Sequence, residues 1–206
     1  MAKNYGGYEG IYQWQLDELA GCDLGERASD LGLSPEPDGG LRLRFFGRDY
    51  LVSRQGVRPV DGGRVSVNHL SLIAHYAMSA GRGEPLGEFL PLRRLSGTVE
   101  GRGSYDHEAV SRPLEIKYGH NLPALRKAAL RLEGREMGRD KSGGLAWIFY
   151  PFPKVPLKLV FHEPDEEFSA EFRLLFDRSA PFFMSFEALG FLAGAFVREI
   201  CRDDQG

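Results

Sequence analysis

The stretch Leu145-Ala-Trp-Ile-Phe-Tyr150 decides the fold of this chain. It is a continuous apolar run of strand length and is rich in aromatic residues, which is typical of a buried β-strand. Residues 156–162 and 172–176 lie on either side of a turn-like acidic segment and predict two further strands. We therefore predict an antiparallel sheet in this half of the chain.

A helix is expected directly after the third strand. Ser185 is a typical N-cap residue, because its side-chain oxygen can accept a hydrogen bond from a backbone amide of the first turn. The apolar residues that follow it fall on one face of a helix: Phe186, Leu189, Leu192, Ala193, Phe196, Val197 and Ile200.

The first half of the chain contains a similar set of signals. Residues 41–46 and 49–53 read as two strands joined at Gly47-Arg48, which predicts a hairpin. Ser66 is expected to cap a helix that runs to about Ala80. A further amphipathic helix is predicted near the N-terminus.

The two halves also resemble each other in detail. Gly39-Gly-Leu41 corresponds to Gly143-Gly-Leu145, and Ser66-Val-Asn-His-Leu70 corresponds to Ser185-Phe-Glu-Ala-Leu189. The offset of roughly a hundred residues is far longer than the period of a solenoid repeat. Either the chain contains an old internal duplication, or two α+β segments share this similarity by chance.

These patterns predict the fold class and the domain organisation. We expect an α+β protein with two related helix–β-hairpin–helix halves, each forming a short antiparallel sheet covered by helices. The halves would span about residues 8–82 and 105–202, with 83–104 as a connecting segment. Together they would form one domain over residues 1–206.

Composition excludes several classes of function. The net charge of −3 at pH 7 gives no electrostatic basis for binding nucleic acid. The N-terminal sequence has no apolar signal region, and no apolar run approaches the roughly 20 residues of a membrane span. The two cysteines, Cys22 and Cys201, have no metal-type spacing and indicate reduced thiols. We therefore expect a soluble cytoplasmic protein without nucleic-acid or membrane partners.

A family resemblance lies mainly in the second half. The Pro-rich segment Pro151-Phe-Pro-Lys-Val-Pro156, the acidic turn Asp165-Glu-Glu-Phe168 and the segment Leu175-Phe-Asp-Arg-Ser179 resemble the DUF3786 family of anaerobic bacteria and methanogens, a domain of unknown function. The resemblance implies anaerobic physiology and metal or tetrapyrrole cofactors nearby. It implies no catalytic residue. Some relatives carry a cysteine-rich segment for an iron–sulfur cluster, but the two cysteines here cannot supply its four thiolates.

Three residues of the second half are weak candidates for metal binding. His162 and Asp165 belong to the acidic turn, where they could hold a divalent cation or act as acid and base. The alternative is a solvated hairpin turn. Asp177 ends an apolar strand, and its alternative role is to cap the amides of its own loop.

A ligand site is predicted along the line where the two halves meet. His75 on the Ser66 helix, and Tyr105 and His107 after the glycine-rich segment 97–104, are the candidate ligand-binding residues. The glycine-rich segment could open and close over such a site. Clefts between packed units are common places for small ligands. Exposure of Phe182 or Phe183 would also mark a ligand or partner surface.

The function that these features favour is a binding or accessory protein of anaerobic metabolism, which takes a cofactor-sized ligand such as a tetrapyrrole. No nucleophile–base pair and no metal-ligand spacing stands out in the sequence. One alternative is an enzyme with a carboxylate/histidine site drawn from His107, His162 and Asp177. The other is a protein–protein adaptor without a small-molecule pocket.

Overall fold

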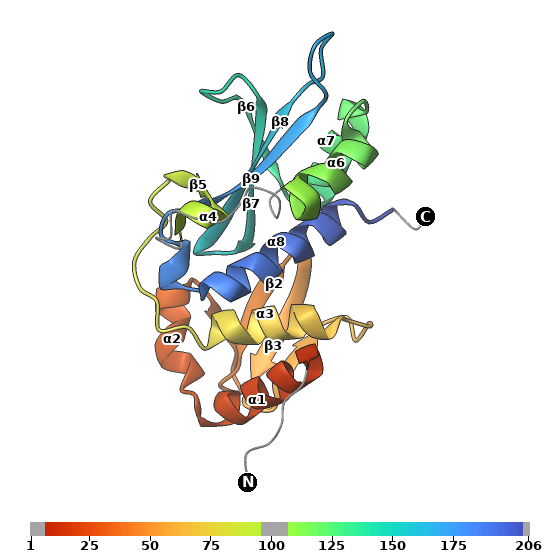
Figure 1. The fold of residues 1–206 in the computed structure, drawn as a ribbon. Coiled ribbons are helices and arrows are strands. Elements are labelled where there is room, and N and C mark those ends of the chain that lie inside the picture. The colour runs from red at the N-terminus through yellow and green to blue at the C-terminus, as the bar shows by residue number, and fades with distance from the viewer. Residues whose placement is uncertain (1–6, 96–106, 204–206) are drawn as a thin grey trace.

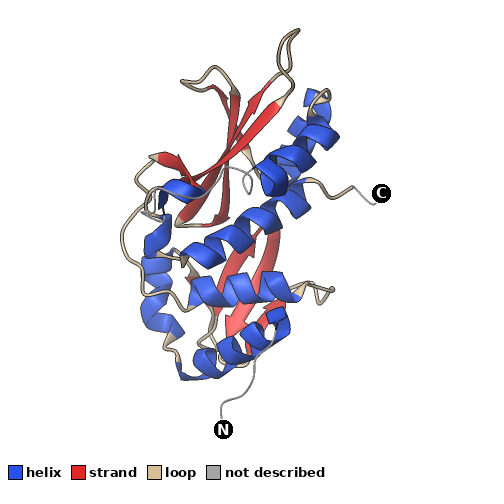
Figure 2. Ribbon diagram, viewed as in Figure 1, coloured by secondary structure: helices blue, strands red, loops and turns tan. Residues whose placement is uncertain are grey.

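The computed structural model describes residues 7–95 and 107–203. It contains two antiparallel sheets with helices packed around them, so the predicted α+β class is confirmed (Figures 1 and 2). In Figure 1, helices α1, α3 and α8 lie one above another, with the first sheet behind α3 and the second sheet above α8. Within the described residues, none of the helices is both long and apolar enough to cross a membrane.

The first half forms the smaller sheet, in which neighbouring strands follow the order β1-β2-β3-β4. Its elements are α1 (Gly7–Gly21), α2 (Leu24–Leu31), β1 (Ser34–Pro35), β2 (Leu41–Phe45), β3 (Arg48–Ser53), β4 (Gly56–Pro59) and α3 (Val67–Ala77).

The second half forms a five-stranded sheet of order β5-β9-β8-β7-β6. Its elements are β5 (Phe89–Pro91), α4 (Leu92–Leu95), the π-helix η1 (His107–Ser111), α6 (Arg112–Tyr118), α7 (Leu122–Arg131), β6 (Arg135–Arg139), β7 (Leu145–Phe152), β8 (Val155–His162), β9 (Glu171–Asp177), the 3₁₀-helix η2 (Ala180–Phe182) and α8 (Phe186–Ile200).

The aromatic run at residue 145 forms β7, at the interior of this sheet. The strand extends two residues beyond Tyr150, to Phe152. Trp147 and Phe149 face the core, since neither is more than 1% exposed. Ser185 caps α8 as predicted, because its Oγ accepts a hydrogen bond from the amide of Ala188 at 3.3 Å. Local sequence therefore determines both elements.

The first-half hairpin is confirmed, with its turn one residue earlier than predicted. Phe46 and Gly47 occupy the two turn positions with φ of 49° and 77°, the left-handed backbone that two-residue hairpin turns require. The register pairs Phe45 with Arg48. Strands β4 and β6 were not predicted, because they have no apolar alternation; every residue of β6 is exposed.

The internal duplication stays a prediction. In both halves two α-helices are followed by four strands in meander order and then a Ser-capped helix, but the second half also contains η1 before α6 and η2 before α8. β2 and β7, which begin at the two Gly-Gly-Leu segments, are both the second strand of their meander. The connecting segment, however, is more than a connector, because β5 within it pairs with β9 and extends the second sheet.

Close packing fills the middle of the seam, by which we mean the contact of β2 and α3 with β7 and α8. The ring of Phe152 stacks on Phe45 at 4.8 Å and on Tyr76 at 4.4 Å between centroids. Tyr76 also donates a hydrogen bond to the carbonyl of Leu31 at 2.7 Å. A ligand therefore has no room at the centre of the seam.

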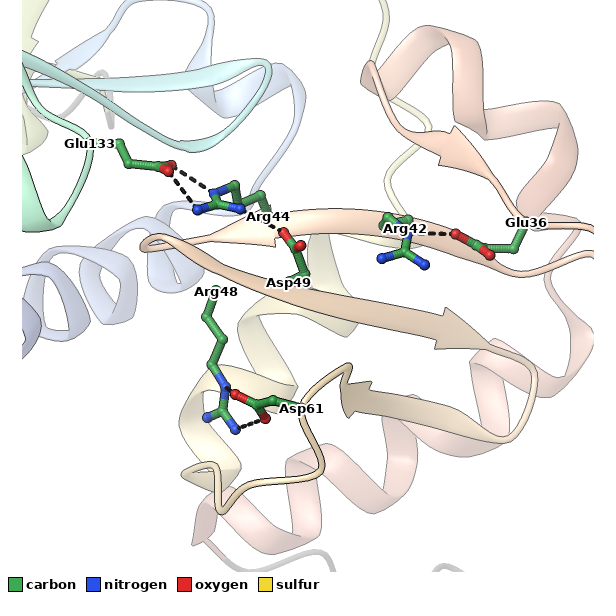
Figure 3. Close-up of polar contacts among 7 residues, drawn as sticks. All are labelled: Glu36, Arg42, Arg44, Arg48, Asp49, Asp61 and Glu133. Carbon is green, nitrogen blue, oxygen red and sulfur yellow. Dashed lines mark hydrogen bonds and ion pairs between the residues drawn. The ribbon is translucent and has the colours of Figure 1, made fainter.

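Ion pairs cover the outer side of the first hairpin (Figure 3). Arg44 contacts both Asp49 and Glu133, at 3.1 and 2.7 Å, and so links the first hairpin to the end of α7. The neighbouring arginines form their own pairs: Arg42 with Glu36 and Arg48 with Asp61. Exposed pairs of this kind contribute little to stability, but they neutralise the cationic face of this hairpin.

Candidate functional site

A cleft of about 300 Å³ lies at one end of the seam, where α1, the end of α3 and the segment before α8 meet. We call it the seam cleft. Its lining combines aromatic rings, two thioethers, a histidine and one carboxylate. The lining residues are Trp14, Glu18, His75, Met78, Ser79, Pro181, Phe182, Phe183, Met184 and Ser185.

Two exposed aromatic residues form walls of this cleft. Trp14 belongs to α1 and remains 47% exposed, and Phe182 ends η2 and remains 64% exposed. Gly81 lets η2 approach the end of α3, because a Cβ at this position would lie 2.3 Å from the carbonyl oxygen of Phe182. We predicted from the sequence that an exposed Phe182 or Phe183 would mark a ligand or partner surface, and Phe182 is the exposed one of the two.

His75 joins the two halves at the base of the cleft. Its Nε2 accepts a hydrogen bond from the backbone amide of Ser185 at 3.2 Å. An accepting Nε2 means that the neutral ring carries its proton on Nδ1. Burial lowers the pKa of His75 below its usual value, and the nearby carboxylate of Glu187 offsets this only in part. The neutral ring is therefore the form that this packing selects.

His69 occupies the other end of the α3–α8 contact. Its Nε2 lies 3.7 Å from Oε1 of Glu199, near the end of α8. Burial lowers the pKa of His69 despite the attraction of Glu199. Because His75 contacts the start of α8 and His69 its end, the two helices run antiparallel.

These histidines predict that stability falls in mild acid. Groups whose pKa is lower in the folded state stabilise it above their unfolded pKa of about 6.5, and this stabilisation is lost as the pH falls through the folded value. Between pH 7.5 and 5.5 we expect the melting temperature to fall less in His75→Gln, which keeps an acceptor for Ser185, than in the wild type. Thermal melts at both pH values check this, with the exposed His120→Gln as control. Equal slopes in all three proteins would contradict a role for His75.

The structure describes the three predicted ligand residues to different extents. His75 lines the seam cleft. Tyr105 and the glycine-rich segment 97–104 lie outside the described residues, and of His107 only the backbone, at the start of η1, is described. The predicted lid over the site therefore stays a prediction, and His75 is the member of the trio around which a site is visible.

Asp177 has the capping role that was its alternative. It is fully buried at the end of β9. Its carboxylate accepts hydrogen bonds from the amide and hydroxyl of Ser179 and from the amides of Leu86 and Gly87, at 2.6 to 2.9 Å. Burial alone would raise the pKa of Asp177, but these donors together lower it. With its acceptor positions occupied in this way, Asp177 ties the segment before β5 to the second sheet.

The carboxylate/histidine set of the enzyme alternative is not brought together. His162 pairs with Glu171 at one end of β9, and Asp177 lies six residues further along that strand, about 20 Å away at the usual rise per residue. His162 instead lies 3.1 Å from the hydroxyl of Ser142. These two residues cannot share one substrate.

The acidic turn likewise has a structural explanation. Asp165 accepts hydrogen bonds from the amides of Glu167 and Phe168 at 2.9 and 2.8 Å, and Glu163 pairs with Arg139 at 2.8 Å. A second depression of about 530 Å³ borders this turn. Within residues 7–95 and 107–203, no group of three or more histidine, cysteine, aspartate or glutamate side chains is arranged to hold a metal ion.

Sequence reasoning missed most of the cleft lining. Trp14 and Glu18 are four residues apart on α1 and so share one face. Trp14, a large aromatic residue outside the predicted apolar face of this helix, is a signal that could have pointed to them but was not used. No sequence pattern indicated that α1 would meet the segment before α8.

The fold and the cleft define an α+β protein with two meander sheets and a small aromatic cleft at the junction of its halves. The chain belongs to the family described as Domain of unknown function (DUF3786), whose model matches residues 23–199. No curated protein and no solved structure matches the chain.

Proposed function

We propose that this protein is a binding or accessory module whose ligand is a small organic molecule held in the seam cleft. The observation that carries the proposal is the convergence of Trp14, Phe182 and His75 on one cleft at the junction of the two halves. Ligand sites are mostly apolar and aromatic, contain a few polar groups, and have volumes of roughly 300–1,000 Å³. The seam cleft meets these criteria at the lower end of the range.

A role in anaerobic metabolism, as the family resemblance implies, is part of this proposal. The tetrapyrrole version is more demanding. Axial ligation of a tetrapyrrole metal by His75 needs a free lone pair on a ring nitrogen. The lone pair of Nε2 already accepts a hydrogen bond from the amide of Ser185. A cleft of about 300 Å³ would hold one edge of a macrocycle and leave the rest in solvent.

The two tryptophans provide the test. Trp14 lines the cleft, whereas Trp147 is 1% exposed in the core and serves as an internal reference. With ¹⁵N-labelled protein purified without air, we expect at least one probe among indole, haem, a corrinoid and choline to shift the indole signal of Trp14 and leave that of Trp147 in place. An absorbance spectrum of the same sample reports any bound tetrapyrrole.

Matched variants identify the site. Phe182→Ala is expected to weaken binding of the active probe roughly fivefold, because one aromatic wall is lost. Phe168→Ala removes a ring of similar exposure, 69%, beside the acidic turn and is expected to leave binding unchanged. If no probe shifts the indole signal of Trp14, the small-molecule proposal is wrong and the protein–protein adaptor becomes the favoured alternative.

A further inference from the structure

We infer that the ligand of the seam cleft is a small organic cation, with a methylated ammonium group as its charged end, held against the rings of Trp14 and Phe182 and balanced by Glu18. This inference rests on the proposed function, and it adds the charge and chemical class of the ligand.

The electrostatics of the lining favour a positive ligand. Among the described residues that form the cleft, Glu18 is the one with a side chain charged at neutral pH, because His75 is held neutral by burial. Within the described part of the chain, Glu18 has no ion-pair partner. A second carboxylate, that of Glu187, lies close enough to His75 to raise the pKa of its ring in part. Glu18 therefore gives the lining itself a negative charge, while the guanidinium of Arg27 lies beside the cleft, where it donates to the carbonyl of Met78.

The aromatic walls favour the same kind of ligand. The face of an aromatic ring carries negative electrostatic potential, strongest for tryptophan, and attracts a cation within about 6 Å of the ring centre. Trp14 precedes Glu18 by one helical turn, so the ring and the carboxylate lie on the same face of α1. Methylated ammonium groups suit this environment, because their methyl groups can also pack against Met78 and Met184.

An anionic ligand would have to overcome this arrangement. The start of α8 is a place where anions are often bound, but its donors are partly used. The amide of Ser185 donates to His75, and the hydroxyl of Ser185 accepts from the amide of Ala188. Glu187 in the first turn already complements the helix dipole. A carboxylate-bearing ligand would face the carboxylate of Glu18 in the lining, and the nearby guanidinium of Arg27 already donates to the carbonyl of Met78.

Choline and its uncharged isostere 3,3-dimethyl-1-butanol separate charge from shape. We expect choline to shift the Trp14 indole signal with an affinity about five- to tenfold higher than the alcohol, the difference that cation–π and carboxylate attraction produce at a partly exposed site. The titrations use the full chain at constant ionic strength. The signal of Trp147 is expected to stay in place.

Two variants on the same helix test the carboxylate. Glu18→Gln is expected to weaken choline binding about threefold to fivefold and to leave binding of the alcohol unchanged. Glu9→Gln changes the net charge by the same amount at a residue outside the lining, and is expected to match the wild type. Equal weakening by both variants would reduce the effect to overall charge and overturn the inference.

The outcomes distinguish the inference from the proposed function. If the alcohol, or indole, binds at Trp14 as tightly as choline or more so, the cleft is a ligand site but the cationic class is wrong. If haem or a corrinoid shifts Trp14 and choline does not, the same conclusion follows. If none of these probes shifts Trp14, the proposed function itself fails.

Discussion

Asp177→Ala is expected to lower the free energy of unfolding by about 3 kcal/mol, because it removes a buried acceptor and leaves the buried amide and hydroxyl of Ser179 without a partner. The carboxylate accepts four hydrogen bonds in a fully buried position and joins residues 86–87 to the end of β9. Asp177→Asn keeps one acceptor oxygen and is expected to fall between alanine and the wild type. Urea denaturation followed by circular dichroism gives all three values.

Asp165→Ala is the matched control for this result. Asp165 also accepts two amides of its own turn, but this turn is exposed to water. Water can replace the lost carboxylate there, so we expect a change within about 1 kcal/mol. A comparable loss in both variants would mean that the burial of Asp177 is not what makes it important.

Phe152→Ala is expected to cost about 3–5 kcal/mol, the range for removing a large aromatic side chain from a packed core. Phe152 is fully buried and stacks between a ring of β2 and a ring of α3. It therefore contributes to the cohesion of the two halves as well as to the second sheet. Tyr150→Ala, two residues away on the same strand and 61% exposed, is expected to change stability far less.

The same packing predicts that the two halves unfold together. Trp14 lies in the first half and Trp147 in the second, so their indole signals report on each half separately. In a urea titration of the wild type, both native signals are expected to disappear at the same midpoint, as for a single cooperative domain. Two separate midpoints would show that the halves are independent units.

Local sequence was sufficient for the elements with strong periodicity or strong caps. The run at residue 145 predicted β7, and Ser66 and Ser185 predicted α3 and α8, because strand pleating and N-cap hydrogen bonds involve near neighbours in the chain. The short strands β4 and β6 were missed. They pair with neighbouring strands through backbone groups, which place no demand on side-chain pattern.

For the candidate site, sequence alone determined the chemistry of single residues but not which residues lie next to one another in space. It identified His75 as a candidate and offered capping as a role for Asp177, because those assignments depend on residue type and local spacing. The tertiary structure alone decided that Trp14, His75 and Phe182 border one cleft. It also decided that His162 and Asp177 lie at opposite ends of the paired strands β8 and β9. Such contacts join residues tens to more than a hundred positions apart, and they arise from the packing of whole helices and sheets against a common core.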